Sequence, residues 1–190
     1  MSLPNNDLPG TFTAPGEVRL VRLLPGPIER VWEFLTDPEK RARWFCGGTT
    51  EQRSGGRIEF AMHHRNLAPD ETPPPEFAHV QDPGVTFEGR VLRCEPPRLL
   101  VFTFGSDDSE VTFELAPRGS RVEFVVTHRT RGAEEQSELS NYASGWHTHV
   151  HHLIALLEGA PRPPFWPLHA RLKAEYERTR PAPAAAAPVQ

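Results

Sequence analysis

The residues Glu134 to Glu158 form the feature that most constrains the fold of this chain. At about 1.5 Å per residue, a helix over this stretch would be roughly 37 Å long, whereas a strand of seven or eight residues spans about 25 Å. A turn of about 100° per residue places its apolar side chains in one arc of about 120°. These side chains are Leu139, Tyr142, Trp146, His149, Val150, Leu153, Leu156 and Leu157. The stretch therefore predicts a helix that can cover a whole sheet with one buried face.

Both ends of this helix carry the expected signals. Glu134, Glu135 and Glu138 stand near its N-terminus, where the helix dipole favours negative charge. Gly159 and Pro161 follow its last turn, which is typical of a helix C-terminus. We therefore expect the helix to begin near Glu134 and to end at Glu158.

The first third of the chain predicts an arm, a strand and two short helices. Residues 1–16 are rich in Pro, Gly and Asn without periodicity, so we expect a mobile arm. Glu17 to Leu24 is aliphatic and predicts a strand, which Pro25 and Gly26 close. The helical spacing of the apolar residues after Pro27 predicts a helix up to Thr36.

A second short helix is expected from Pro38, with Asp37 as its N-cap and Ala42, Trp44 or Phe45 directed toward the core. Lys40, Arg41 and Arg43 make this helix the most basic part of the chain. We interpret these charges as a solvated helix face.

From Arg57 onward the apolar residues recur with period two, which indicates strands. The predicted strands are Arg57 to Met62, Val85 to Cys94, Leu99 to Phe104, Glu110 to Leu115 and Arg121 to His128. The prolines of segment 63–75 exclude a central strand there, so this loop should project from a sheet edge or cover an opening. Residues Glu76 to Gln81 are compatible with a further strand. Clean alternation with short turns, including an acidic turn at Ser106 to Ser109, predicts a six- or seven-stranded antiparallel sheet with one buried face.

The C-terminal part predicts a stiff connector, a helix and a tail. The connector APRPPFW follows Gly159, and Leu168 to Arg178 predicts a last helix whose Leu172 and Tyr176 dock at the domain edge. The low-complexity residues 179–190 predict a disordered tail. The sequence thus predicts one domain over residues 17–178.

Composition excludes several classes of protein. A net charge of −4 with intermixed signs argues against a nucleic-acid partner, which requires a basic face. Cys46 and Cys94 are far apart and show no ligand spacing, so we expect free thiols in a reducing compartment. The N-terminus lacks an apolar targeting segment, and no run approaches the ~18 apolar residues of a membrane span. We therefore expect a cytoplasmic protein without membrane insertion.

Several stretches of this sequence resemble a known family. They are GPIERVWEFLTDPEKRARWF, SGGRIEF, FEGRVLRCEPPRLLVFTF, SEVTFEL and ASGWHTHVHHLIALLEG. Over about residues 17–159 the chain resembles the homologues of the C-terminal domain of the heat-shock protein 90 ATPase activator, within the START-like (SRPBCC) superfamily. This resemblance implies an α+β helix-grip fold, in which a curved antiparallel sheet wraps around the long C-terminal helix.

In a helix-grip fold, a cavity is expected between the sheet and the long helix, so inward side chains are either core or ligand contacts. Strand parity and the helix arc select the candidates Phe60, Met62, Phe87, Val91, Phe102, Phe104, Phe113, Phe124, Trp146, His149, Val150 and Leu153. So many aromatic rings on one concave face favour an apolar ligand site with a few polar groups. His128 and His149 are the candidates for those groups and for catalysis, although each is also compatible with a structural role.

The other histidines give weaker signals. His147 and His151 have the i, i+4 spacing of a metal pair but are predicted to point toward solvent, so we expect no metal site and no cofactor. His63, His64 and His79 could join the mouth of a cavity. Gly145 interrupts the helix interior, which suggests either a bend that widens the cavity or a tolerated glycine.

The sequence leaves three functions open. The first is the binding of a small hydrophobic or amphipathic molecule between helix and sheet. The second is an enzyme of cyclase or hydrolase type that uses His149 or His128 as general acid or base. The third is a chaperone-accessory interaction module, which the family resemblance suggests. Homodimerisation through an edge strand or the last helix stays undecided.

Overall fold

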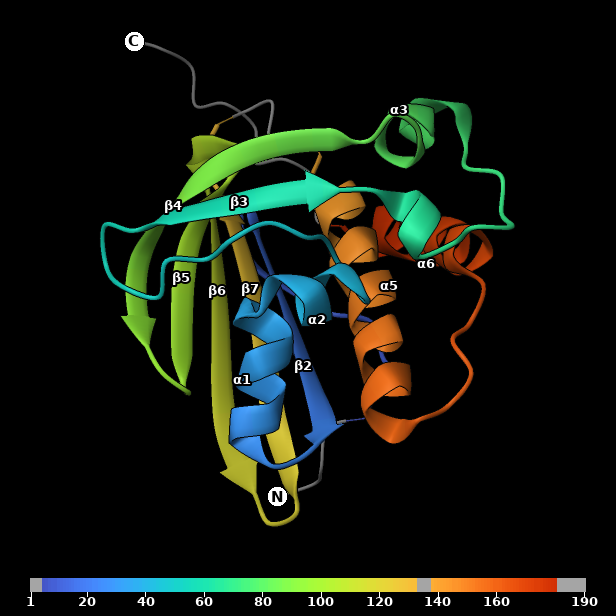
Figure 1. The fold of residues 1–190 in the computed structure, drawn as a ribbon. Helices are drawn as coiled ribbons and strands as arrows, with labels where there is room; N and C mark the ends of the chain where they lie inside the picture. The colour runs from blue at the N-terminus through green and yellow to red at the C-terminus, as the bar shows by residue number, and fades with distance from the viewer. Residues whose placement is uncertain (1–4, 133–137, 181–190) are drawn as a thin grey trace, which may run out of the picture.

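The computed structural model describes residues 5–132 and 138–180. Seven antiparallel strands form one sheet in the order β1-β2-β7-β6-β5-β4-β3. The strands are β1 (Thr11–Ala14), β2 (Glu17–Pro25), β3 (Arg57–Met62), β4 (Val85–Glu95), β5 (Leu99–Phe104), β6 (Ser106–Arg118) and β7 (Arg121–Thr130). The sheet curves around the helices that cover its concave face (Figure 1).

Two long and several short helices complete the domain. The helices are α1 (Ile28–Thr36), α2 (Pro38–Ala42), η1 (His64–Asn66), η2 (Pro75–Phe77), α3 (Ala78–Gln81), α5 (Leu139–Glu158) and α6 (Phe165–Thr179). Helix α5 lies along β2 and β7, α1 lies over β6 and β7, and α6 packs against α5 (Figure 1). This arrangement confirms the predicted α+β helix-grip fold.

The helix ends follow from their sequences. The side chain of Asp37 accepts hydrogen bonds from the backbone N–H groups of Glu39 (3.0 Å) and Lys40 (2.9 Å), which confirms it as the N-cap of α2. Gly159 ends α5 in the left-handed region at φ 67°, where a side chain would be strained. The predicted start of α5 at Glu134 falls in residues 133–137, outside the described part of the chain; the described helix begins at Leu139.

The core lies between the concave face of the sheet and helices α1 and α5. The predicted alternation holds in β6, where Val111, Phe113 and Leu115 are buried, and in β7, where Val122, Phe124 and Val126 are buried. From α5, the side chains of Val150, Leu153 and Leu157 pack into the same cluster. Burial of an apolar side chain stabilises a fold by about 1.5–3 kcal/mol, so this shared cluster is the main force that holds helix and sheet together.

The structure differs from the sequence-based expectation near the N-terminus. Residues 11–14 of the predicted arm form strand β1, which pairs with the N-terminal half of β2. The run Thr11, Phe12, Thr13 has high β-propensity, and pairing satisfies the backbone groups along the edge of β2. Residues 1–4 lie outside the described part.

Two further segments differ from expectation. The predicted acidic turn 106–109 belongs to β6, because the chain reverses already at Gly105 with φ 81° and Ser109 pairs with Thr130. Residues Glu76 to Gln81 are helical, in η2 and α3, rather than extended. Pro75 sits in the first turn of η2, where the fixed φ of proline suits a helical start.

Arg41 is a buried cation, which corrects the interpretation of α2 as a solvated basic face. Its side chain is 1% exposed. The guanidinium donates to four backbone carbonyls and to one hydroxyl, and these acceptors are Cys46 O (3.1 Å), Gly47 O (2.9 Å), Gly48 O (2.9 Å), Glu59 O and Thr50 Oγ1 (2.8 Å). Five donors in a fixed fork allow arginine to satisfy so many acceptors, so Arg41 ties the segment 46–50 to strand β3.

We expect Arg41→Met to lower the free energy of unfolding by roughly 3 kcal/mol, because several buried carbonyls lose their donors together. Urea unfolding monitored by circular dichroism measures this change. Arg43 is exposed, so Arg43→Met is the matched control and should cost less than about 1 kcal/mol. Equal losses in the two variants would contradict the structural role of Arg41.

Candidate functional site

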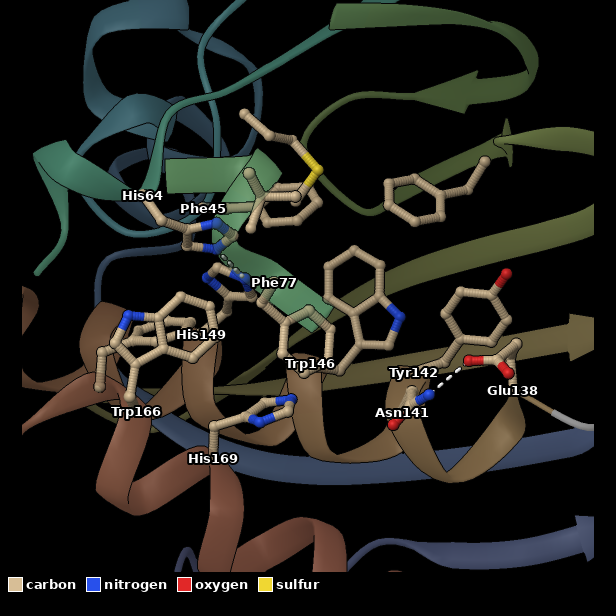
Figure 2. A pocket seen from close by; sticks show the side chains of 15 residues that line it. Phe45, His64, Phe77, Glu138, Asn141, Tyr142, Trp146, His149, Trp166 and His169 are labelled. Atoms are coloured by element: carbon tan, nitrogen blue, oxygen red, sulfur yellow. Dashed lines mark hydrogen bonds between the residues drawn. The ribbon is translucent and has the colours of Figure 1, made fainter. Parts of the chain in front are cut away.

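A pocket of about 220 Å³ lies beside the N-terminal half of α5. Its wall comes from α5, from the sheet, from the segment between β3 and β4, and from α6 (Figure 2). The lining residues are Phe45, Met62, His64, Phe77, Val80, Phe104, Glu138, Asn141, Tyr142, Gly145, Trp146, His149, Phe165, Trp166 and His169. Such a concave, mostly apolar site with a few polar groups has the general character of a small-molecule site.

Aromatic rings in mutual contact build the wall on the sheet side. The ring of Phe45 lies 4.8 Å from that of Trp146 and 6.1 Å from that of Phe104, centroid to centroid. Phe104 and Trp146 are in turn 5.8 Å apart. Tilted and edge-to-face pairs at these distances are attractive beyond their buried area. The rings therefore support one another and present apolar faces and edges to the pocket.

The other side of the pocket is covered by a structure that we call the cap, defined as residues 64–81 together with α6. The cap has its own small core of Leu67, Ala68, Phe165 and Trp166, against which Phe77 and Val80 pack. Helix α6 also contributes Leu172 and Tyr176 to the core between sheet and helices. The cap therefore has a small core of its own over the pocket and is anchored to the rest of the domain through α6.

One carboxylate joins the two parts of the cap. Glu71 Oε1 accepts from the backbone N–H of Phe165 (2.8 Å), and Glu71 Oε2 accepts from that of Trp166 (2.9 Å). Free N–H groups and the positive end of the helix dipole make this helix start a good place for a carboxylate. Gln81 adds a second link, because its Oε1 accepts from Trp166 Nε1 (3.1 Å) and its Nε2 donates to Glu71 O (2.8 Å).

Two histidines meet in the pocket wall. His149 Nδ1 lies 2.8 Å from the carbonyl oxygen of Trp44, which can only accept, so this nitrogen carries the hydrogen. In the neutral ring His149 Nε2 is then an acceptor, and it lies 3.4 Å from His64 Nε2. A hydrogen bond between these two nitrogens requires the hydrogen of His64 to be on Nε2, whereas the backbone of Val80 also engages the His64 ring. The two rings lie side by side in the pocket wall (Figure 2).

Burial keeps the pocket histidines neutral. It lowers the pKa of His64 to about 4 and that of His169 to about 4. The pKa of His149 is lowered well below its usual value, mainly by burial and secondly by the neighbouring His64. The cause is that a charged imidazolium loses its hydration when it is buried. Near pH 7 the pocket thus offers neutral imidazoles rather than cations.

His128 lies outside the pocket lining, with both ring nitrogens hydrogen-bonded. Its Nδ1 accepts from Trp146 Nε1 (3.0 Å), so its Nε2 carries the hydrogen and donates to Ser109 Oγ (2.8 Å). The side chain is fully buried, and burial lowers its pKa to about 3. Both ring nitrogens are occupied, and the ring fixes the orientation of Trp146.

His147 does not point toward solvent, which corrects the sequence-based expectation. Its ring is fully buried, and its Nδ1 accepts from the hydroxyl of Tyr176 on α6 (3.0 Å). That hydroxyl accepts in turn from the N–H of Gly10 (2.6 Å). His151 is half-buried and stacks on His147. The physical reason is that α6 packs against the face of α5 that carries His147. The apolar arc alone predicted that this face is exposed to solvent.

The structure divides the predicted cavity residues into two groups. Met62, Phe104, Trp146 and His149 line the pocket. The others belong to the main core or pack against it, outside the pocket lining: Phe60, Phe87, Val91, Phe102, Phe113, Phe124, Val150 and Leu153. Of the three loop histidines, His64 joins the pocket, whereas His63 and His79 are exposed.

Sequence reasoning missed the contribution of α6 and α3. Phe165, Trp166 and His169 line the pocket, although the first two were assigned to a stiff connector. The available signal was the aromatic pair directly after Pro164, which is the N-cap of α6, with His169 one turn further on. A proline-rich connector that ends in two large aromatic residues favours a docked helix start over a solvated linker.

Within residues 5–132 and 138–180, no three His, Cys, Asp or Glu side chains are placed to hold a metal ion together. The described helices also include none that is both long enough and apolar enough to cross a membrane.

Seven antiparallel strands wrap around the long helix α5 in the helix-grip fold, and the family match places the chain in the START-like superfamily. Residues 25–158 match the family described as "Activator of Hsp90 ATPase homolog 1-like protein", and the chain belongs to this family. Strand β1 and helix α6 lie outside the matched range.

Solved structures show the same fold. A protein of Bordetella parapertussis, solved by solution NMR, is 39% identical over 94% of this chain and 95% of its own, with a TM-score of 0.74. CalU16 from Micromonospora echinospora is 22% identical over 86% of this chain and 87% of its own, with a TM-score of 0.62. DynU16, a protein of the dynemicin biosynthetic locus, is 24% identical over 77% of this chain and 49% of its own, with a TM-score of 0.59. No curated protein sequence matches the chain significantly.

The buried histidines predict a loss of stability in mild acid. Unfolded imidazoles have a pKa of about 6.5, whereas burial lowers the folded values of His64, His152 and His169 to about 4. Between these values the unfolded chain binds more protons, so the stabilisation is complete above pH 6.5 and is lost as the pH falls toward 4. The free energy of unfolding from urea titrations should be flat from pH 8 to 7 and then fall, by ~1.4 kcal/mol per pH unit for each proton taken up.

Two variants test the origin of this slope. His152 is buried and its Nε2 donates to the carbonyl of Pro163 (3.0 Å), so His152→Gln should keep a donor but remove one titrating group and flatten the slope. His79 is exposed, so His79→Gln should leave the slope unchanged. A midpoint that is constant between pH 7 and pH 5 would show that buried imidazoles do not control acid stability.

Proposed function

We propose that this protein binds a small hydrophobic or amphipathic molecule in the pocket between α5, the sheet and the cap. The observation that carries the proposal is Gly145. It lines the pocket from the interior of α5, and a Cβ built on it would meet no atom within 4 Å. A glycine in a helix interior costs ~1 kcal/mol relative to alanine, and packing does not require it here. The glycine lowers helix stability and keeps this space open, and we infer that a bound ligand fills it.

The size and the wall of the pocket narrow the class of ligand. At about 220 Å³ it is smaller than the ~300–1,000 Å³ of typical drug-sized sites, so we infer a ligand of one or two fused rings. The rings of Phe45, Phe104 and Trp146 favour a flat apolar body, which can stack on them or meet them edge to face. Long-chain lipids fit this volume poorly.

Filling the pocket from Gly145 tests the proposal. Gly145→Leu places an apolar side chain in the open space and replaces glycine by a better helix former. We therefore expect unchanged or higher stability together with at least a tenfold loss of affinity for a probe such as naphthalene. The measurement is an NMR titration that follows the indole N–H signals of Trp146 and Trp166, both in the wall.

The matched control is Gly119→Ala, in a turn far from the pocket lining. It should lower stability, because Gly119 has φ 64°, and should leave the affinity for naphthalene unchanged. Native mass spectrometry of the protein purified from its own cells adds an independent observation, since a bound organic adduct would identify the natural ligand. The proposal fails if naphthalene does not bind and no adduct is found.

An enzyme of cyclase or hydrolase type is the second candidate, and the His64–His149 pair favours it. A backbone carbonyl orients His149 through Nδ1, as required for a general acid or base, and the partner imidazole could share a proton. The test is whether the adduct identified above is converted, and whether His149→Gln abolishes conversion while the circular dichroism spectrum is retained. Both rings also make packing contacts within the protein, His149 with the carbonyl of Trp44 and His64 with the rings of Phe165 and Trp166. These contacts explain both histidines without catalysis, so ligand binding is the first candidate.

The chaperone-accessory function suggested by the family description receives less support. Among the large hydrophobic side chains of the described residues, only Leu8 is exposed, so these residues offer no broad apolar patch for a protein partner. Homodimerisation stays a prediction, which sedimentation analysis would test directly.

A further inference from the structure

The stripe of α5 that lines the pocket is buried at one end and exposed at the other. Along this stripe His149 and Trp146 are buried, Tyr142 and Asn141 are half-buried, and Glu138 is exposed. Figure 2 shows Glu138 and Tyr142 at one end of the lining and His149 at the other. A ligand that lies along α5 therefore meets a buried aromatic end and an end where the wall is open to water.

Glu138 carries the formal charge of this wall. The described residues that line the pocket include no lysine and no arginine, and Glu138 is the only carboxylate among them. The imidazoles of His64, His149 and His169 are neutral near pH 7, for the reasons given above. An anionic ligand would therefore lose hydration without gaining a cationic partner and would be repelled by Glu138.

Two positive features near the pocket do not reverse this sign. Lys173 is outside the lining, where its Nζ lies 5.8 Å from the ring centre of Phe77 and 3.7 Å from Oε1 of Glu76, so its charge already has a carboxylate partner. The N-terminus of α5 is equivalent to roughly half a positive charge, whereas Glu138, its N-cap residue, carries a full negative charge. The exposed end of the pocket therefore favours a cation over an anion.

Glu138 can accept a donor from a ligand and keep its contact within the protein. Its Oε2 accepts from Nδ2 of Asn141, but a carboxylate has two oxygens and about four acceptor positions. The side chain is exposed, so a donor can approach it from the open end. Tyr142 lies one turn further along α5 with its ring 6.4 Å from that of Phe104, and aromatic rings attract cations at their faces.

We propose that the pocket selects a protonated arylalkylamine, a flat ring joined by a short linker to an ammonium group, and that it rejects carboxylates of the same size. The ring packs beside Gly145 against Phe45 and Trp146, and the ammonium group lies at Glu138. This inference rests on the proposed function and specifies the ligand class of the same site. At the exposed end the ammonium group keeps part of its hydration, which lowers the cost of binding a charge.

Three matched probes test the inference on the unmodified protein. They are 2-(2-naphthyl)ethylamine, 2-(2-naphthyl)ethanol and 3-(2-naphthyl)propionate, which share the ring and the linker and differ only in the terminal group. At pH 7 the amine is protonated and the carboxylate is ionised. The amine should bind about threefold to tenfold more tightly than the alcohol, and the carboxylate at least about threefold more weakly than the alcohol.

Dissociation constants from NMR titration of the indole N–H signals or from calorimetry give both ratios. An amine that binds no more tightly than the alcohol, or a carboxylate that binds as tightly as the amine, overturns the inference.

The variant Glu138→Gln assigns the preference to the carboxylate. Glutamine keeps an acceptor for Asn141 but removes the charge, so the ratio of amine affinity to carboxylate affinity should fall at least about threefold. The matched control is Glu114→Gln, an exposed position of β6 outside the pocket lining, which changes the net charge equally and should leave the ratio unchanged. Because the readout is a ratio within one protein, a change in stability does not imitate the result. A ratio that is unchanged in Glu138→Gln, or that falls equally in both variants, excludes Glu138 as the partner of the ammonium group.

The outcomes also separate this inference from the proposed function. If naphthalene binds and Gly145→Leu weakens its binding, the pocket is the site, and the ratios above decide the charge of the ligand alone. If naphthalene and the three probes all fail to bind and no adduct is found, the proposed function itself fails, and the inference fails with it.

Discussion

Burial of α5 on more than one face is the constraint on which the rest of the structure depends. The sheet and α1 cover one side of this helix through the main core, and α6 covers another side. A helix in this position has few directions left in which a polar side chain can reach water. Three of its polar side chains find partners inside the protein: His149 bonds to the carbonyl of Trp44, His147 to the hydroxyl of Tyr176 and Ser144 to the imidazole of His169. The acid sensitivity and the polarity of the pocket both follow from this constraint.

The fold was predictable because it depends on periodicity. Alternation in β6 and β7 and the apolar arc of α5 are properties of local sequence, and they determine which face of each element is buried. The predicted caps Asp37 and Gly159 are confirmed for the same reason. Strand β1 was missed because a four-residue edge strand, with only one neighbour, carries little periodic signal.

The candidate site was only partly predictable, because periodicity gives the direction of a side chain and not what lies opposite to it. Phe104 and Phe113 both point inward from the sheet, but Phe104 lines the pocket whereas Phe113 is packed in the main core. The difference depends on where the cap lies, which the strand pattern does not show. The sequence predicted that His147 is exposed, because it lies outside the apolar arc of α5. The structure shows it buried, because α6 covers that second face of the helix. The docking of α6 depends on contacts such as that between Glu71 and the N–H group of Phe165, which join residues distant in sequence. Such contacts leave no local pattern.

The buried Arg41 links the stability of the domain to the shape of the pocket. Its guanidinium donates to the carbonyls of Cys46 and Gly47, directly after Phe45, and its own carbonyl accepts from the N–H of Phe45 (2.9 Å). Phe45 is the ring that touches Trp146, Phe104 and His149 at once. Arg41 therefore helps to fix the position of Phe45, the ring in the middle of the aromatic wall. Arg41 does not line the pocket, but a substitution there would change the shape of the pocket and the stability of the domain together.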